Sequence, residues 1–203
     1  MTHLRRPATR HIRNGMIAGL LSLSSALALT PAAHAASGQD GAVEIVNDAV
    51  DRTMVALEDS TISESEASNI ADLVAIDRVA KFALGKTWET ISADQQERYV
   101  DAFHVYAKQQ LQEHLSGLSK AEVEVADVET RGNGDAIVMT NVKTAEDPMQ
   151  KLNWRVIKAD GEWGIVDIQA QDVWFAIEQR AQFDAILDKN NGDIEALITE
   201  LKS

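Results

Sequence analysis

Residues 151–168 read KLNWRVIKADGEWGIVDI, and this stretch decides the fold of the chain. In its first half Trp154 and Val156 alternate with polar residues, which is typical of a half-buried strand. Asp160 and Gly161 then make a preferred two-residue hairpin turn, because glycine accepts a positive φ without strain. The second half returns as another strand. The stretch therefore predicts an antiparallel hairpin that carries large apolar side chains and no catalytic motif.

The hairpin belongs to a longer run of strand-like segments. Residues 132–134, Gly-Asn-Gly, give a second turn, and a polar connection at residues 144–148 lies between the two hairpins. Short turns of this kind imply an antiparallel meander. The sequence predicts four strands, at residues 123–129, 136–143, 152–158 and 162–168.

Helical patterns stand on both sides of these strands. Ser63 with Glu66 and Ser92 with Gln95 have the spacing of capping boxes, and Gly85 is suited to end a helix. Helices, then strands, then helices indicate an α+β domain. Apolar residues at helical spacing predict helices at residues 42–58, from 63 onward, at 77–84, 92–115, 172–187 and, as a short last helix, 194–201.

The second predicted strand leaves two architectures open. Ile137, Val138 and Met139 are consecutive apolar residues, so both faces of that strand are apolar. A sheet with one solvated face alternates more cleanly. Either helices cover both faces of the sheet, or a strongly curved sheet encloses an apolar interior.

The first 35 residues have the order of a secretory signal peptide. Four arginines precede an apolar run at residues 16–29, and the segment AHA at residues 33–35 fits a cleavage site of small residues. The apolar run is short for a membrane span. We therefore expect a signal peptide at residues 1–35, export to the periplasm, and a single domain at residues 36–203.

Composition limits what that domain does. Four of the 19 basic residues lie in the expected signal peptide, which leaves 15 against 32 acidic residues and a net charge near −17. Such a surface repels nucleic acid and anionic membranes, so we expect no nucleic-acid partner. The chain has no cysteine, so an exported domain of this sequence depends on packing alone for its stability.

Residues suited to catalysis or metal binding are sparse. His104 and His114 lie ten residues apart on one predicted helix and point about 80° from each other, so we do not expect them to share a metal. No serine has the Gly-x-Ser-x-Gly setting of a hydrolase. Asp167, between apolar residues of a strand, is either a buried acid with a raised pKa or the partner of Arg155 or Arg180.

The aromatic residues remain as candidates for a ligand pocket. The chain has four tryptophans and four phenylalanines, and ordinary core packing is the first interpretation of each. Trp174 and Phe175 differ, because two neighbours in a first helical turn cannot easily both point into one core. We expect this pair to line a pocket.

Two blocks of the sequence resemble the MlaC family of periplasmic phospholipid-shuttle proteins, also described as toluene-tolerance or auxiliary ABC-transport components. Each motif is weak alone, but their order and spacing cover nearly all of the expected domain. The matching residues are, in order, 83–88 (ALGKTW), Ser92, Gln95, Gln96, Phe103, Trp163, 166–168 (VDI), Val173, Arg180, Phe183 and 192–198 (GDIEALI).

The chain departs from the family pattern at a few positions. The family usually has Gly and then Ser-Leu where this chain has Asp172 and then Trp174 and Phe175, and a tyrosine common late in the long helix is replaced near Gln110. These changes leave the fold expectation intact and bear on the shape of the pocket, and hence on which lipid it fits.

The resemblance implies a lipid carrier without a cofactor. Its expected fold is a curved four-stranded antiparallel sheet packed against several helices that enclose an apolar cavity, with acyl tails inside and the headgroup near solvent. The expected partners are a phospholipid, an inner-membrane ABC transporter complex and an outer-membrane lipoprotein–porin complex. The residues expected to contact lipid are Phe82, Trp88, Phe103, Ile137, Met139, Trp154, Val156, Trp174 and Phe175.

Three other functions stay open at this point. A related carrier would take another apolar lipid, such as a hopanoid. An enzyme with a cone-shaped fold would use Asp167 as a base in an apolar pocket. A periplasmic scaffold or chaperone would use apolar surface to bind protein.

Overall fold

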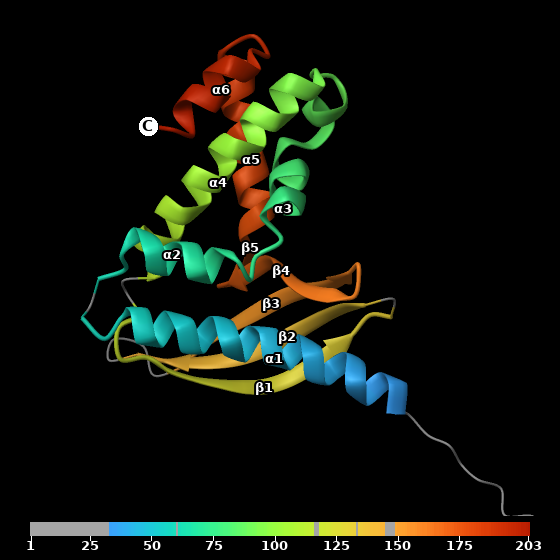
Figure 1. Cartoon of the computed structure of the whole chain (residues 1–203), viewed down its shortest axis with the longest axis vertical. Helices are drawn as coiled ribbons and strands as arrows, with labels where there is room; N and C mark the ends of the chain where they lie inside the picture. Colours follow the sequence, from blue (N-terminus) through green and yellow to red (C-terminus); the bar gives the residue numbers. More distant parts are fainter. Residues whose placement is uncertain (1–32, 60, 116–117, 133, 145–148) are drawn as a thin grey trace, which may run out of the picture. The chain divides into compact units, whose positions relative to one another are not determined.

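The structure, a computed structural model, describes residues 33–59, 61–115, 118–132, 134–144 and 149–203. These residues form helices and one sheet (Figure 1). Residues 1–32 of the expected signal peptide lie outside the described residues. No described helix combines the length and hydropathy needed to cross a bilayer. The helices are α1 (Ala33–Ala56), α2 (Glu64–Ala71), α3 (Ile76–Leu84), the 3₁₀-helix η1 (Gly85–Glu89), α4 (Ala93–Leu115), α5 (Phe175–Lys189) and α6 (Ile194–Glu200).

The sheet is an open antiparallel meander whose strands lie in sequence order. The α+β class and the four predicted strands are confirmed, but a sheet of only four strands is wrong, because a short fifth strand follows. The strands are β1 (Glu122–Thr130), β2 (Asp135–Lys143), β3 (Gln150–Ala159), β4 (Glu162–Ala170) and β5 (Val173–Trp174).

The fifth strand corrects the predicted helix at residues 172–187. Gln171 and Asp172 have positive φ angles of 50° and 64°, so the chain reverses at these two residues. Trp174 then pairs with Gln169 in β4, and α5 begins only at Phe175. Trp174 and Phe175 are therefore not neighbours in a helical turn, because Trp174 still belongs to the sheet.

The predicted turn between β3 and β4 is confirmed. Asp160 and Gly161 have φ angles of 54° and 91°, and the flanking pair Ala159 and Glu162 face each other in the ladder. Two consecutive positive φ angles are typical of the hairpin turn whose twist matches that of the strands.

β1 is the outer strand at the other side of the sheet. It carries carboxylates at Glu122, Glu124, Asp127 and Glu129. Its register with β2 shifts between Val125 and Asp127, which marks a bulge. The strand thus combines charge and a local kink along its length.

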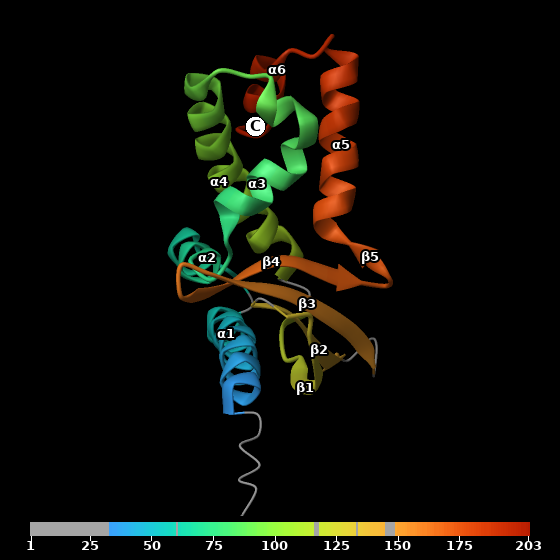
Figure 2. The ribbon, with the colours of Figure 1, turned by 90° about the vertical axis from the view of Figure 1, so that its right-hand side faces the viewer.

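α1 covers one face of the sheet (Figures 1 and 2). Its apolar residues recur at spacings of three and four, as one helix face requires. They pack against β2, β3 and β4 in a group that we name the sheet cluster. Its buried members are Ala42, Ile45, Val46, Ala49, Ala136, Val138, Trp154, Val156 and Ile165.

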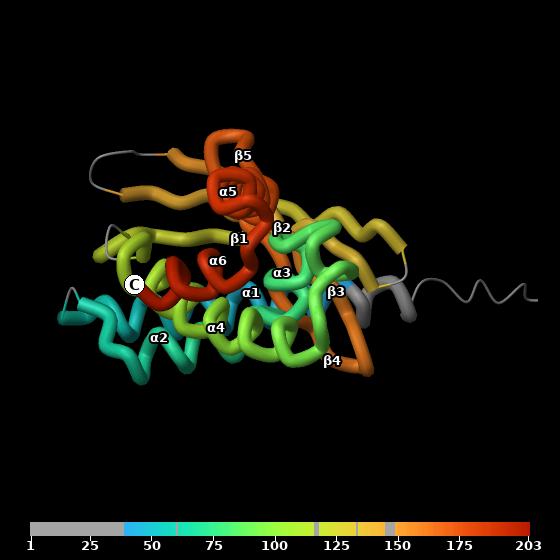
Figure 3. Tube along the Cα trace, turned by 90° about the horizontal axis from the view of Figure 1, so that it is seen from above, coloured from blue at the N-terminus to red at the C-terminus, as the bar shows by residue number. Residues whose placement is uncertain are grey.

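The helices α3 to α6 form a second core, which we name the helical cluster. Seen from above, α3 and α6 lie between α4 and α5 (Figure 3). Aromatic rings fill its centre: the Phe183 ring lies 6.0 to 6.3 Å from the rings of Tyr99, Phe103 and Tyr106, centroid to centroid. The buried members of the helical cluster are Ala71, Ile76, Ala80, Ala83, Leu84, Tyr99, Ala102, Phe103, Phe183, Leu187, Ile194, Leu197, Ile198 and Leu201.

The predicted helix caps are present. Ser63 and Glu66 form a capping box at α2, and the Ser92 side chain accepts a hydrogen bond from Gln95 N at 3.2 Å. Gly85 follows the last residue of α3 with a φ of 60°, as predicted for a helix end. These local signals place the helix ends within a residue or two of the prediction.

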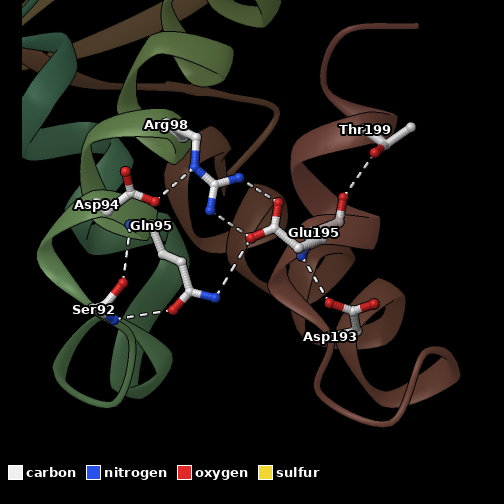
Figure 4. A network of polar contacts seen from close by, with 7 residues as sticks. All are labelled: Ser92, Asp94, Gln95, Arg98, Asp193, Glu195 and Thr199. Carbon is white, nitrogen blue, oxygen red and sulfur yellow. Dashed lines mark hydrogen bonds and ion pairs between the residues drawn. The ribbon is translucent and has the colours of Figure 1, made fainter.

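A polar network joins the start of α4 to the start of α6 (Figure 4). Arg98 lies between the two helices, donating to Asp94 at 3.0 Å and to Glu195 Oε1 at 2.7 Å. Asp193 caps α6 by accepting from the backbone N–H of Glu195 at 2.9 Å. The Arg98 side chain holds the pKa of Glu195 below its usual value. The network links the start of the last helix to the start of the long one.

Residues 72–75, the connector between α2 and α3, lie where the two cores meet. Ile165 N in β4 donates to Leu73 O at 2.9 Å, and Ala75 N donates to Ile165 O at 2.8 Å. Gly164 allows this approach, since a Cβ at that position would lie 3.1 Å from the Ala75 Cβ. Val74 packs against both clusters. The connector thus joins the helical cluster to the sheet, and we call this junction the seam.

Candidate functional site

The two faces of the sheet have different surroundings. α1 lies against β1 to β4 on one face, whereas α3 and α5 contact the sheet at β4. Trp154 and Val156 lie on the α1 face within the sheet cluster. The Trp154 indole N–H donates to Thr140 Oγ1 at 3.0 Å, which satisfies its one polar atom in a buried position. Both residues serve the packed interior on that side.

Ile137 and Met139 lie on the opposite face, because successive side chains of a strand alternate. The register places Met139, Asn153, Gln169 and Trp174 in one row across β2, β3, β4 and β5. Asn153 Nδ2 donates to Gln169 Oε1 at 2.6 Å in the middle of the row. The two apolar candidates Met139 and Trp174 are thus separated by an amide pair.

Asp167 connects this second face to the start of α5. Its Oδ1 accepts the backbone N–H groups of Ala176 and Ile168, both at 2.9 Å. Burial raises the pKa of Asp167, while the two hydrogen bonds and the charge of Arg155 act in the opposite direction. Asp167 therefore caps α5 from a neighbouring strand, in place of the residue that precedes the helix.

The predicted ion pair of Asp167 is not formed. Arg155 lies opposite Asp167 in the ladder, but its guanidinium pairs with Asp135 at 2.8 Å. Arg180 instead stacks over the ring of Phe82, with 5.6 Å between the guanidinium carbon and the ring centroid. Asp167 is half-buried and not buried, and partial burial is the main cause that raises its pKa.

The remaining predicted contacts lie in the helical layer and on its surface. Phe103 is buried in the helical cluster and Trp88 packs against it, with 6.5 Å between the Trp88 and Tyr99 ring centroids. Phe82 and Phe175 are exposed, at 44% and 50% of their full surface. The nine residues expected to contact lipid therefore occupy four places: the two clusters, the second face of the sheet, and the surface beside α3 and α5.

Two hollows open on the surface of the described residues. One, of about 310 Å³, lies at the ends of β3 and β4 and is lined mainly by polar residues such as Asn153 and Gln169. The other, of about 450 Å³, lies between α2, α3 and α4 and includes the connector residue Val74. None of the nine residues expected to contact lipid lines either hollow. In the part of the chain that the structure describes, no three His, Asp or Glu side chains are grouped to hold a metal ion.

The family comparison decides what this architecture is. The model of the MlaC protein family matches residues 45–203, which is well over half of the chain. The chain belongs to the MlaC family. No curated protein sequence matches it. The resemblance inferred from the two motif blocks is thereby confirmed.

A solved structure supports the fold of this MlaC chain. The phospholipid-binding protein of Ralstonia solanacearum, solved in complex with a phospholipid, superposes with a TM-score of 0.67. The two share 18% sequence identity over 81% of this chain and 94% of that protein. At this identity the likeness concerns the fold alone.

The two motif blocks that carry the MlaC resemblance meet in space. Gly85 of the first block lies against Arg180 of the second, and a Cβ at Gly85 would come 2.5 Å from Arg180 Nη2. The absence of a side chain at Gly85 therefore lets the guanidinium lie over the end of α3. The contact ties α3 to α5.

Sequence reasoning missed the features that span distant segments. Val74 and the hollow beside it combine α2, α3 and α4, and nothing in the spacing of residues 68–108 indicates that they meet. The capping role of Asp167 toward Ala176 was equally hidden, because it depends on the reversal at Gln171 and Asp172. A strand acid shortly before a predicted helix start is the one local signal that would have suggested it.

Proposed function

We propose that this protein is a periplasmic carrier of phospholipid that shuttles lipid between an outer-membrane lipoprotein–porin complex and an inner-membrane ABC transporter complex. The observation that carries the proposal is membership of the MlaC family together with the fold of a protein solved with a phospholipid bound. The secretory pattern of residues 1–35 supports a periplasmic location. The solved protein that shares this fold binds a phospholipid, so we infer a binding role in preference to catalysis.

The need for such a carrier follows from the hydrophobic effect. Each buried CH₂ group contributes about 0.8 kcal/mol relative to water. Two acyl chains of about 15 methylenes each would therefore cost roughly 24 kcal/mol to expose. Relative to a bilayer, an apolar protein site is nearly neutral, so transfer through it is reversible and depends on the partners.

We place the acyl tails between the helical cluster and the sheet cluster. These are the two largest groups of buried apolar residues in the described domain, and Val74 packs against both. Tails that lie between them would replace contacts among apolar side chains by contacts between apolar side chains and acyl chains. Little apolar surface would therefore be exposed to water. Of the residues expected to contact lipid, this arrangement uses those of the two clusters: Trp88, Phe103, Trp154 and Val156.

The negative charge of the domain fits a carrier that must leave membranes. A net charge near −17 disfavours adhesion to anionic lipid surfaces and leaves specific partners to bring the carrier to each membrane. Alternative cargo of an apolar kind, such as a hopanoid, would use the same clusters.

Lipid extraction tests the proposal. The full chain, expressed with its signal peptide and purified from periplasm, should release phospholipid into organic solvent, detected by mass spectrometry. Purified protein that is empty, and that moves no labelled phospholipid between donor and acceptor vesicles, would contradict it. Release of a different apolar lipid would correct the cargo and keep the carrier role.

A further inference from the structure

The hollow of about 450 Å³ between α2, α3 and α4 combines an apolar floor with charged walls. Its volume is within the range of sites for small ligands. Ala71 and Ile76, each 6% exposed, form part of its floor and belong to the helical cluster. Val74 also lines it and packs against both clusters. The hollow therefore opens directly over the seam between the two cores.

Two cations from different helices line the same hollow. Arg78 comes from the first turn of α3 and Lys108 from the middle of α4. Among the residues that the structure describes, no ion pair joins either of them to a carboxylate. In a domain with 32 acidic residues against 15 basic ones, two cations at one hollow that are outside these ion pairs suit an anionic ligand.

Two carboxylates, Asp72 and Asp77, also line the hollow. Asp77 Oδ1 lies 2.8 Å from His104 Nε2, one helical turn before Lys108 on α4. The hydrogen bond with Asp48 is the main cause that raises the pKa of Arg52, outside the hollow, and the charge of Asp72 adds to it from further away. The guanidinium of Arg78 and the ammonium of Lys108 can donate hydrogen bonds to a ligand in the hollow.

We propose that this hollow binds the phosphodiester headgroup of the carried lipid, with Arg78 and Lys108 donating to its phosphate oxygens. The inference rests on the proposed carrier function and adds the position and chemistry of the headgroup. A planar guanidinium matches two phosphate oxygens, and an ammonium adds a point charge. The apolar floor then continues from the glycerol backbone toward the tails between the clusters.

A competition between two lipids isolates the headgroup. The purified full chain is stripped of lipid and then loaded from vesicles of neutral carrier lipid. These vesicles hold equal amounts of phosphatidylglycerol and diacylglycerol with identical acyl chains. Native mass spectrometry then reads the ratio of the two bound species. Because the tails are the same, the ratio reports the contribution of the phosphoglycerol headgroup.

The variant pair Arg78→Gln with Lys108→Gln removes the two cations from the hollow. The matched control, Lys158→Gln with Lys189→Gln, removes two exposed cations elsewhere. We expect the hollow variant to lower the ratio of bound phosphatidylglycerol to diacylglycerol about tenfold, and the control to leave it within twofold, since two partly exposed charge-assisted contacts each supply a factor of a few. Circular dichroism checks that both variants remain folded.

The outcomes separate the two proposals. If the natural sequence binds neither lipid, the proposed function as a phospholipid carrier is wrong. If it binds lipid and the hollow variant keeps the same ratio as the control, the carrier function stands and the headgroup site is wrong. Loading in 50 mM inorganic phosphate distinguishes a lipid headgroup from the free anion. The preference of the natural sequence should persist, and its abolition by phosphate would overturn the assignment to lipid.

Discussion

Replacing Asp167 separates a structural cap from a catalytic base. Asp167→Ala removes the acceptor of two backbone N–H groups, on Ala176 and Ile168. Loss of a helix cap costs about 1 kcal/mol. Leaving a buried donor without a partner adds about 1–3 kcal/mol, and relief of the buried charge offsets part of this. We expect a loss of about 2 kcal/mol in the free energy of unfolding for Asp167→Ala.

Asp167→Asn is the matched control. Its side-chain oxygen occupies the place of Oδ1 and accepts the same two hydrogen bonds, so we expect a change of less than about 0.5 kcal/mol. Urea unfolding at pH 7.5, followed by tryptophan fluorescence, measures both variants. With a urea dependence of about 2 kcal/mol per molar, the Ala midpoint should fall by about 1 M. Equal midpoints for Ala and Asn would refute the capping role.

The pH dependence of the same pair tests the buried charge. Burial raises the pKa of Asp167 in the folded state. The folded state then binds a proton more readily than the unfolded state. This stabilising contribution is therefore fully present below the unfolded pKa and is lost as the pH rises through the folded pKa. The natural sequence should gain stability relative to Asp167→Asn as the pH falls from 7 to 4. A difference that does not change with pH would contradict the raised pKa.

Three further expectations concern stability. Phe183→Ala should lower the free energy of unfolding by about 3–5 kcal/mol in urea titrations, because the ring is 1% exposed among three other aromatic rings. Gly85→Ala should cost about 1–2 kcal/mol by the same method, since its φ is 60°, and adding Arg180→Ala should not restore stability. A double-mutant cycle of Arg98→Ala and Glu195→Ala should show a small coupling that shrinks as NaCl is raised, because both side chains are more than 40% exposed; a large coupling that is insensitive to salt would contradict this.

The parts of the fold that local chemistry sets were predictable. Ser63 and Ser92 each begin a helix with a side-chain partner three residues on, and Asp160 with Gly161 closes its hairpin without help from distant residues. The fifth strand was not predictable in this way. Gln171 and Asp172 are not glycines, so their residue types do not mark the positive φ angles that precede the strand at Val173.

The candidate site was predictable only in its chemistry. Strand alternation places Trp154 and Met139 on opposite faces only once the register between β2 and β3 is known. The sequence of the connection between these strands does not determine that register. The place of Phe103 and Phe82, one buried and one exposed, depends on how α3, α4 and α5 pack. Aromatic composition pointed to apolar binding, while tertiary contacts distribute those residues among separate surfaces.

The charged outer strand has a consequence for how two copies of this chain meet. An open sheet offers its last strand as a template for the same strand of another molecule. Here, copies aligned along β1 would bring Glu122, Glu124, Asp127 and Glu129 of each molecule close to carboxylates of the other, and the kink at the bulge would spoil the hydrogen-bond spacing. Pairing of two molecules along β1 is therefore disfavoured, although the sheet is open at this edge.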